Sequence, residues 1–469
     1  MYVKEKAVLS VIAVSGRERT RSQHKSKKIV ILPRLIGFFV LLVLYFVPRY
    51  GMFVPPFVLV CGLSLPYIYM HFVKRRSRKA NWYNRIYVIT YISSLFIHFY
   101  SSSIYSSISF FAYFVLTYLI IEQAVRTKGD FEKSISFILV LFVIYALFGI
   151  FEAVTGRNLI NMLFNKTSNW AAYGSKRYGL SLSTGFMTVM HNNAALMCMG
   201  WALAAYRVCN MKSQKGWWAC AWCVIGLGCM TVMSRTVMFT APILQLIIFR
   251  KQGMKWLSRR ALILISLALI AILVLGSEVL APLTNAIVGL VAPVVDEVFG
   301  TSIKSQVNST LGGSGQRGVL WIWITDAVKN NIFFGKGFTD IWSTAVSGKN
   351  YIGQVWTVEK TSIEVHWLRT LYNTGLYGLA GFILYQVGVI LKTWKQKVKC
   401  YEQKVTFQYT LKWISVFYFI HLFGMSAAEE LQFFYILFAL YLSYVHICNH
   451  NPSNRLRKAG VRYARRTHR

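Results

Sequence analysis

Long apolar stretches alternate with short polar segments along almost the whole chain of 469 residues. A transmembrane helix needs ~20 mostly apolar residues to cross the ~30 Å hydrocarbon core of a bilayer, and about twelve such stretches can be marked. They begin near Ile29, Gly51, Tyr83, Ile104, Ser134, Thr184, Trp217, Thr236, Ala261, Trp367, Thr406 and Leu431. The pattern predicts an all-α polytopic membrane protein with about 12 transmembrane helices.

Basic residues lie in short clusters that fall at every second connection between these stretches, which puts the clusters on one side of the expected membrane. Lys and Arg number 52 and Asp and Glu 16, which gives a net charge of +36. The positive-inside rule places the clusters, and with them both termini, in the cytoplasm. The charge therefore indicates topology and attraction to anionic lipid rather than a nucleic-acid partner. Only 14% of the residues are charged, against about 25% in soluble domains, which argues against a soluble fold.

The expected topology divides the chain into five parts. These are a basic cytoplasmic arm (1–28), nine transmembrane helices (29–277) with an outer loop at about 154–183, a large extracytoplasmic loop (278–366), three transmembrane helices (367–448) and a basic cytoplasmic tail (449–469). In the large loop, one face of a helical pattern carries Leu320, Trp323, Ile324, Ala327 and Val328. This pattern predicts a short helix lying on the membrane or on the bundle. Because chemistry tends to collect in long loops on a rigid scaffold, the large outer loop is the candidate functional module.

Of the nine histidines, His366 alone lies in the large outer loop, directly before an apolar stretch. On a helix entering the membrane, Arg369, Thr370 and Asn373 would share its face and form a polar stripe. Such a stripe costs insertion free energy without an evident structural need. An imidazole can accept a proton near neutral pH, so His366 is the candidate general base.

Three arginines are expected at or near the outer face. Arg235 follows Ser234 between two spans, Arg177 lies in the shorter outer loop, and Arg317 follows a glycine-rich segment. Guanidinium groups stay ionised and can grip phosphate through two hydrogen bonds, so together they fit a diphosphate. A solvated loop charge explains Arg177 equally well, and a flexible loop explains the glycine-rich segment equally well.

The sequence lacks the usual motifs of metal-binding and nucleotide-binding sites. The outer segments contain no HExxH, DxD or clustered Cys/His pattern, and the chain contains no P-loop, so neither a metal nor a cofactor is expected. The eight cysteines all fall in expected spans or on the inner side, so no disulfide framework is expected.

Short motifs follow one another in a definite order around the large loop. Ser234-Arg235 opens a mid-chain span, and Arg317 precedes a helical segment containing Trp321. That segment ends at the turn Gly335-Lys-Gly337, and the loop closes at His366, which begins a hydrophobic segment ending in Gly375-Leu-Tyr-Gly378.

In this order, from about residue 177 to the last span, the sequence resembles the O-antigen polymerase and O-antigen ligase superfamily of bacterial envelope enzymes. The family has Asn where this chain has Trp367. Its upstream Arg-x-Gly and Pro-Asn patterns are matched in part, by Arg177-Tyr-Gly179 and by Asn192-Asn193.

The resemblance implies a metal-independent, inverting glycosyl transfer on the outer face of the bacterial inner membrane. The donor is a glycan linked to undecaprenyl diphosphate. His366 would act as the base, and the diphosphate would be held by Arg235, Arg317 and Arg177. Supporting roles are expected for Trp321, Arg369, Asn373, Glu429 and Glu430. The two glutamates alternatively cap the last span by complementing its positive end.

The expected activity is that of a polymerase of O-antigen, capsule or exopolysaccharide, which joins lipid-linked repeat units. An O-antigen ligase, which transfers the glycan to lipid A-core, shares donor and mechanism and is the near alternative. A flippase for lipid-linked oligosaccharides is the alternative from the transporter class, although the long outer loop and the scarcity of acidic residues in spans argue against it. The expected partners are the lipid-linked glycan, membrane lipid, a chain-length regulator and a flippase.

Overall fold

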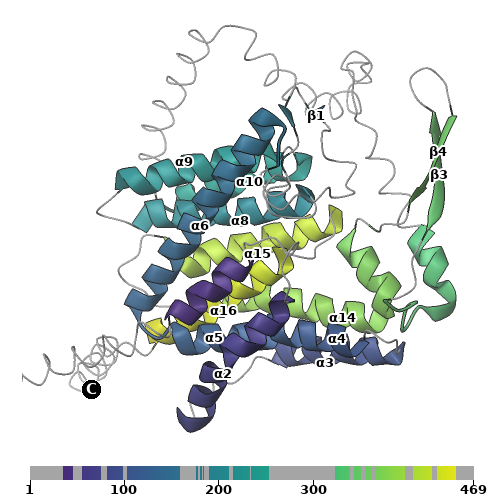
Figure 1. Cartoon of the computed structure of the whole chain (residues 1–469), viewed down its shortest axis with the longest axis horizontal. Helices are drawn as coiled ribbons and strands as arrows, with labels where there is room; N and C mark the ends of the chain where they lie inside the picture. Colours follow the sequence, from purple (N-terminus) through teal and green to yellow (C-terminus); the bar gives the residue numbers. More distant parts are fainter. Residues whose placement is uncertain are drawn as a thin grey trace, which may run out of the picture.

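The computed structural model describes most of the helical stretches and part of the large outer loop. The described residues are 35–45, 55–74, 82–98, 103–158, 176–177, 180–181, 183, 190–210, 215–232, 234–252, 323–338, 343–349, 355–360, 363, 365–396, 405–424 and 430–449. Over these residues the protein is mostly helical, as the hydropathy pattern predicts (Figure 1).

The helices follow one another along the chain with few strands between them. After an apolar helix at Leu35–Tyr45 come α2 (Pro56–Lys74), α3 (Trp82–Ile97), α4 (Ser103–Phe111), the π-helical segment η1 (Ala112–Leu116), α5 (Thr117–Ala124), α6 (Lys128–Thr155), α8 (Met190–Asn210), α9 (Lys215–Thr231), α10 (Arg235–Gln252), the 3-10 turn η2 (Lys329–Asn331), α14 (His366–Lys395), α15 (Phe407–Gly424) and α16 (Glu430–Asn449).

Four of the described helices are long and apolar enough to cross a membrane: Ser103–Ala124, Lys128–Thr155, His366–Lys395 and Gln432–Asn449. Three further apolar helices are shorter: Leu35–Tyr45, Pro56–Phe72 and Gly216–Thr231. By length and composition this is therefore a membrane protein. Each expected apolar stretch corresponds to a described helix, except the one that begins near Ala261, which lies outside the described residues together with the basic arm and tail.

The last helix, α16, occupies the centre of the bundle. Every residue from Phe433 to Tyr441 is buried, as expected for a helix that is apolar on all sides. It packs against α5, α15, α6 and α8, and Figure 1 shows it among these helices. Two residues of this buried helix, Gln432 and Tyr435, line the cavity described below.

Helices α3 and α14 approach each other closely because α14 carries glycine on the shared face. Gly381 lies against Thr90, and a Cβ atom at Gly388 would lie 2.5 Å from the ring of Tyr83. Small residues at such an interface let two helix backbones approach and pack. The contact fixes the position of α14, the helix that begins at His366.

The segment 278–366, which the sequence predicts as the large outer loop, contains a short helix and a hairpin. Residues 323–328 are helical, and Ile324 and Val328 are buried, which confirms the predicted apolar face. The strands β3 (Thr344–Lys349) and β4 (Val355–Lys360) pair in an antiparallel ladder, which the all-α expectation did not include. Figure 1 shows this hairpin standing away from the helices.

Candidate functional site

The longest helix, α14, is broken at Gly375, whose φ of 62° and ψ of −164° are not helical. The section after the break, residues 376–395, is about 30 Å long, which equals the thickness of the hydrocarbon core. Lys392 and Lys395 lie in its last turn. The section before the break, which begins with His366, therefore extends beyond a complete span, and Figure 1 shows it turned away from the second section.

Residues 332–337 of the large outer loop dock into this break through the backbone. Four hydrogen bonds join the two segments: from the N–H of Lys336 to Tyr372 O (2.7 Å), of Gly337 to Asn373 O (3.1 Å), of Leu376 to Ile332 O (2.8 Å) and of Tyr377 to Phe333 O (3.0 Å). An unbroken helix would pair these groups internally, and buried backbone groups need partners. The loop thus replaces the missing helical turn, and two motifs far apart in sequence meet here.

Glycine is required on both sides of this junction. Gly375 and Gly335 have φ values of 62° and 73°, a region that other residues rarely adopt. A Cβ atom at Gly335 would lie 2.5 Å from the carbonyl oxygen of Tyr372, and one at Gly375 would meet the backbone of Phe333. The two glycine motifs are therefore explained by the geometry of one contact.

The section before the break presents a polar face. The Thr370 hydroxyl donates to the His366 carbonyl at 2.9 Å, and the Thr374 hydroxyl donates to the Thr370 carbonyl at 2.7 Å. The His366 ring lies 4.8 Å from the ring of Phe382, on the other side of the break. Arg369 is exposed, and among the described residues none forms an ion pair with it.

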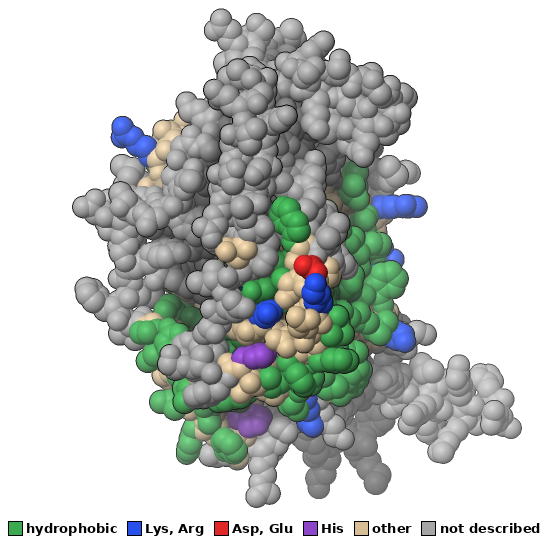
Figure 2. All heavy atoms as spheres, turned by 90° about the vertical axis from the view of Figure 1, so that its right-hand side faces the viewer, with side chains coloured by type: hydrophobic (Ala, Val, Ile, Leu, Met, Phe, Trp, Pro, Cys, Tyr) green, Lys and Arg blue, Asp and Glu red, His purple; other side chains and the backbone are tan. Residues whose placement is uncertain are grey.

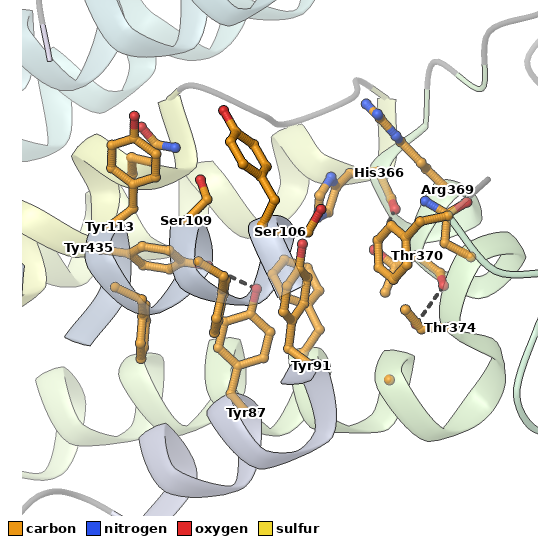
Figure 3. A pocket seen from close by; sticks show the side chains of 18 residues that line it. Tyr87, Tyr91, Ser106, Ser109, Tyr113, His366, Arg369, Thr370, Thr374 and Tyr435 are labelled. Atoms are coloured by element: carbon orange, nitrogen blue, oxygen red, sulfur yellow. Dashed lines mark hydrogen bonds between the residues drawn. The ribbon is translucent and has the colours of Figure 1, made fainter. Parts of the chain in front are cut away.

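A cavity of about 330 Å³ lies beside this face, and His366, Arg369 and Asn373 all line it. The sequence prediction that these three residues share one polar stripe is thus confirmed. The other walls come from α3, α4, η1 and α16. Figure 3 shows His366 and Arg369 at one end of the cavity and Tyr113 and Tyr435 at the other.

The face of the molecule shown in Figure 2 carries both apolar and polar side chains. Figure 2 faces the side on which the β3–β4 hairpin lies in Figure 1. Histidine, basic and acidic side chains are grouped there among hydrophobic and uncharged polar ones. In the segment 323–331, Lys329 donates a 2.8 Å hydrogen bond to Asp326, which raises the pKa of the lysine.

The wall opposite His366 is aromatic and rich in hydroxyl groups, and the sequence reasoning missed it. It contains Tyr87 and Tyr91 of α3 and Tyr105, Ser106, Ser109 and Phe110 of α4. One signal was available, because six of the nine residues from Ser101 to Ser109 are serine. So many hydroxyl groups are unusual in a segment whose only task is to face lipid.

A second polar cluster joins Asn158 and Ser183 to the helices α6 and α8. The buried Glu152 carboxylate near the end of α6 accepts hydrogen bonds from Asn158 (2.9 Å) and Ser183 (3.2 Å). The Asn193 amide of α8 donates to the Ser183 carbonyl at 3.3 Å. The sequence reasoning did not single out Glu152, although an acidic residue at the end of a long apolar segment is a functional signal.

The three arginines expected at the outer face are described only in part. Arg177 ends the strand β1 (Lys176–Arg177), which pairs with β2 (Leu180–Ser181) two residues before Ser183. Arg235 is the first residue of α10. The side chains of both, and the whole of Arg317, lie outside the described residues.

The structure also leaves several of the predicted supporting residues undescribed. Trp321 and Glu429 lie outside the described residues, as does the side chain of Glu430, the first residue of α16. Within the part of the chain that the structure describes, no three His, Cys, Asp or Glu side chains gather as they would around a metal ion.

Comparison of this chain with known protein families, curated proteins and solved structures found no match.

Proposed function

We propose that this protein is a membrane glycosyltransferase that polymerises a bacterial surface polysaccharide. It transfers a glycan from undecaprenyl diphosphate to a lipid-linked repeat unit on the outer face of the inner membrane. The observation that carries the proposal is the cavity, in which His366, Arg369 and Asn373 face aromatic rings and hydroxyl groups. A base, a cation and a surface with both apolar and hydroxyl character are the groups that this reaction uses.

The reaction replaces one bond at the anomeric carbon by another. His366 accepts the proton of an acceptor hydroxyl while that oxygen forms a bond to the anomeric carbon. The bond from this carbon to the diphosphate oxygen breaks, and its electron pair leaves with undecaprenyl diphosphate. Attack from the face opposite the leaving group inverts the configuration. General base catalysis of this kind contributes about 10²–10⁴ to the rate.

Cations near the leaving group stabilise the charge that develops on it. Arg369 provides one guanidinium at the His366 end of the cavity. We assign the grip on the diphosphate to Arg235, Arg317 and Arg177, in keeping with the resemblance. Undecaprenyl diphosphate is itself an activated leaving group, so the transfer requires no further energy source.

The position of the cavity along α14 supports an outward-facing site. The cavity is lined from both sides of the break, by residues from His366 to Phe382, and the long section ends further along the chain with Lys392 and Lys395. Basic residues favour the cytoplasmic end of a span. The polar face of the first section then lies at the outer membrane surface.

The test is a gel of surface and lipid-linked glycan from cells that lack this protein, complemented with the wild type, His366→Ala or the control His71→Ala. His71 belongs to α2 and is within 3.4 Å of Gln123, away from the cavity-lining residues. We expect glycan with a single repeat unit in the deletion strain and in His366→Ala, and full-length polymer with the wild type and His71→Ala.

Other outcomes refute the proposal in different ways. Polymer that stays on undecaprenol, with bare lipid A-core, identifies a ligase instead. Glycan that is unchanged in the deletion strain removes the polymerase function and leaves the transporter class. Full rescue by His366→Ala shows that His366 is not the base.

A further inference from the structure

A compact stack of aromatic rings borders the cavity, and Figure 3 shows Tyr91 near His366 and Tyr113 at the end away from Arg369. The rings of Tyr91 and Phe110 lie 4.0 Å apart at an angle of 21°, and those of Phe110 and Phe114 lie 5.5 Å apart at 8°. The ring of Phe338, from the docked loop, meets Tyr91 edge-on at 5.8 Å. Tyr91 and Phe110 are only half-buried. The stack therefore supports ring surfaces that border the cavity.

Residues of α4 and η1 line this cavity along one continuous side, which is called the strip below. Three pairs of residues line it at intervals of four: Tyr105 and Ser106, Ser109 and Phe110, and Tyr113 and Phe114. In an α-helix each step of four residues turns the side-chain direction by about 40°. The last pair lies in η1 (Ala112–Leu116), where the wider π turn rotates the direction back. The π segment thus keeps the third pair in line with the first two.

Two hydroxyl groups from outside the strip stabilise this irregular turn. The Thr117 hydroxyl donates to the Ala112 carbonyl at 3.3 Å, and the Tyr45 hydroxyl donates to the Tyr113 carbonyl at 3.2 Å. π turns inside α-helices are rare and occur frequently at functional sites. We therefore attribute the turn to what the strip binds rather than to helix packing alone.

The chemistry of this end matches a sugar ring. A pyranose has apolar C–H faces and a rim of hydroxyl groups, and the strip combines aromatic faces with the hydroxyls of Ser106, Ser109 and Tyr113. Among the described lining residues, the cationic or titratable groups Arg369 and His366 lie at the end of the cavity opposite Tyr113. A phosphate fits that other end, and a polyprenyl chain makes no use of the hydroxyls. The volume of about 330 Å³ is at the lower end of the range for ligand pockets.

We propose that Tyr91, Phe110 and Tyr113 form the subsite for the acceptor, and that they stack on its terminal sugar while one of its hydroxyls faces His366. This inference rests on the proposed function and adds to it the part of the site that selects the acceptor. The cationic end then receives the diphosphate of the donor. The two substrates enter opposite ends of one cavity.

The experiment measures transfer of labelled glycan from undecaprenyl diphosphate to a soluble acceptor, by the full-length protein in lipid nanodiscs. The acceptor is the repeat-unit oligosaccharide released from its lipid. The variants are Tyr113→Ala, Tyr113→Phe, Tyr91→Ala and the control Ile108→Ala. Ile108 lies on the same helix, is 46% exposed and does not line the cavity.

We expect Tyr113→Ala and Tyr91→Ala each to raise the KM for the acceptor about tenfold, the effect of losing one aromatic face. The KM for the donor should stay within about twofold. Tyr113→Phe should keep most of the acceptor affinity because the ring is retained, and Ile108→Ala should behave as the wild type.

The remaining outcomes overturn the inference. A higher KM for the donor with an unchanged KM for the acceptor assigns the aromatic end to the donor or its lipid chain. Unchanged values for both remove the subsite. If the wild type transfers no glycan, the proposed function fails, and direct binding of the released oligosaccharide then decides the subsite alone. Equal binding by the wild type and Tyr113→Ala refutes it.

Discussion

Replacing Gly375 by Ala should separate the docked loop from α14. An alanine at φ 62° and ψ −164° adopts a conformation that is almost restricted to glycine, which costs about 1–3 kcal/mol. Its Cβ atom would also meet the Phe333 backbone, so the hydrogen bonds from Leu376 and Tyr377 to the loop must lengthen. Two such bonds contribute about 1–3 kcal/mol together. The sum is about 4 kcal/mol, which corresponds to a nearly thousandfold change in an opening equilibrium.

The assay is hydrogen–deuterium exchange of the purified full-length protein, followed in peptides that cover residues 332–337 and 371–378. Because the four amides of the junction exchange only when it opens, both peptides should exchange faster by two to three orders of magnitude, as estimated from this free energy. The control is Gly62→Ala in α2, where an added Cβ atom meets nothing within 4 Å. Unchanged exchange in both peptides of Gly375→Ala refutes the account of the junction.

Two further predictions concern buried polar contacts elsewhere in the bundle. Glu152→Ala should lower the midpoint of thermal unfolding because Asn158 and Ser183 lose their acceptor, at about 1–3 kcal/mol, whereas Glu152→Gln should keep most of the stability; equal losses in the two variants contradict this. Arg207 pairs with Glu132 between α8 and α6, so Arg207→Ala should destabilise by about 1.5–3 kcal/mol, the contribution of a hydrogen bond to a charged group, and the double variant with Glu132→Ala should recover part of that loss in the same measurement.

The polar stripe on α14 is predictable from the sequence because it depends on local geometry alone. Residues three, four and seven positions apart share a helix face, so the spacing of His366, Arg369 and Asn373 is enough to place them together. The cavity confirms this grouping. The short helix at 323–328 is predictable for the same reason, since its apolar positions repeat with the helical period.

The junction at Gly375 could not be predicted in this way. The pattern marks Gly335 and Gly337 as a turn and Gly375 as part of a second glycine motif, but the pairing between them joins backbone groups about 40 residues apart. No side-chain periodicity records such a contact. The π turn at Ala112–Leu116 could not be predicted from the sequence either, because one wider turn shifts the helical phase too little to alter the apolar pattern.

The hairpin formed by β3 and β4 was missed although a signal was present. Val355, Thr357 and Val358 are β-branched residues in a short run, which favours a strand. The glycine motifs and the helical pattern are the stronger signals in the surrounding segment. Two paired strands of six residues each are a local exception to the helical pattern that dominates the chain.

The break in α14 also determines how deeply the polar groups sit in the membrane. A continuous helix of 30 residues would be about 45 Å long, and it would have to tilt or distort a bilayer core of ~30 Å. Ending the apolar section at Gly375 removes this hydrophobic mismatch. In the orientation proposed above, the length of residues 376–395 then sets the depth of His366 relative to the lipid headgroups. Tilt of that section would accommodate thicker or thinner membranes.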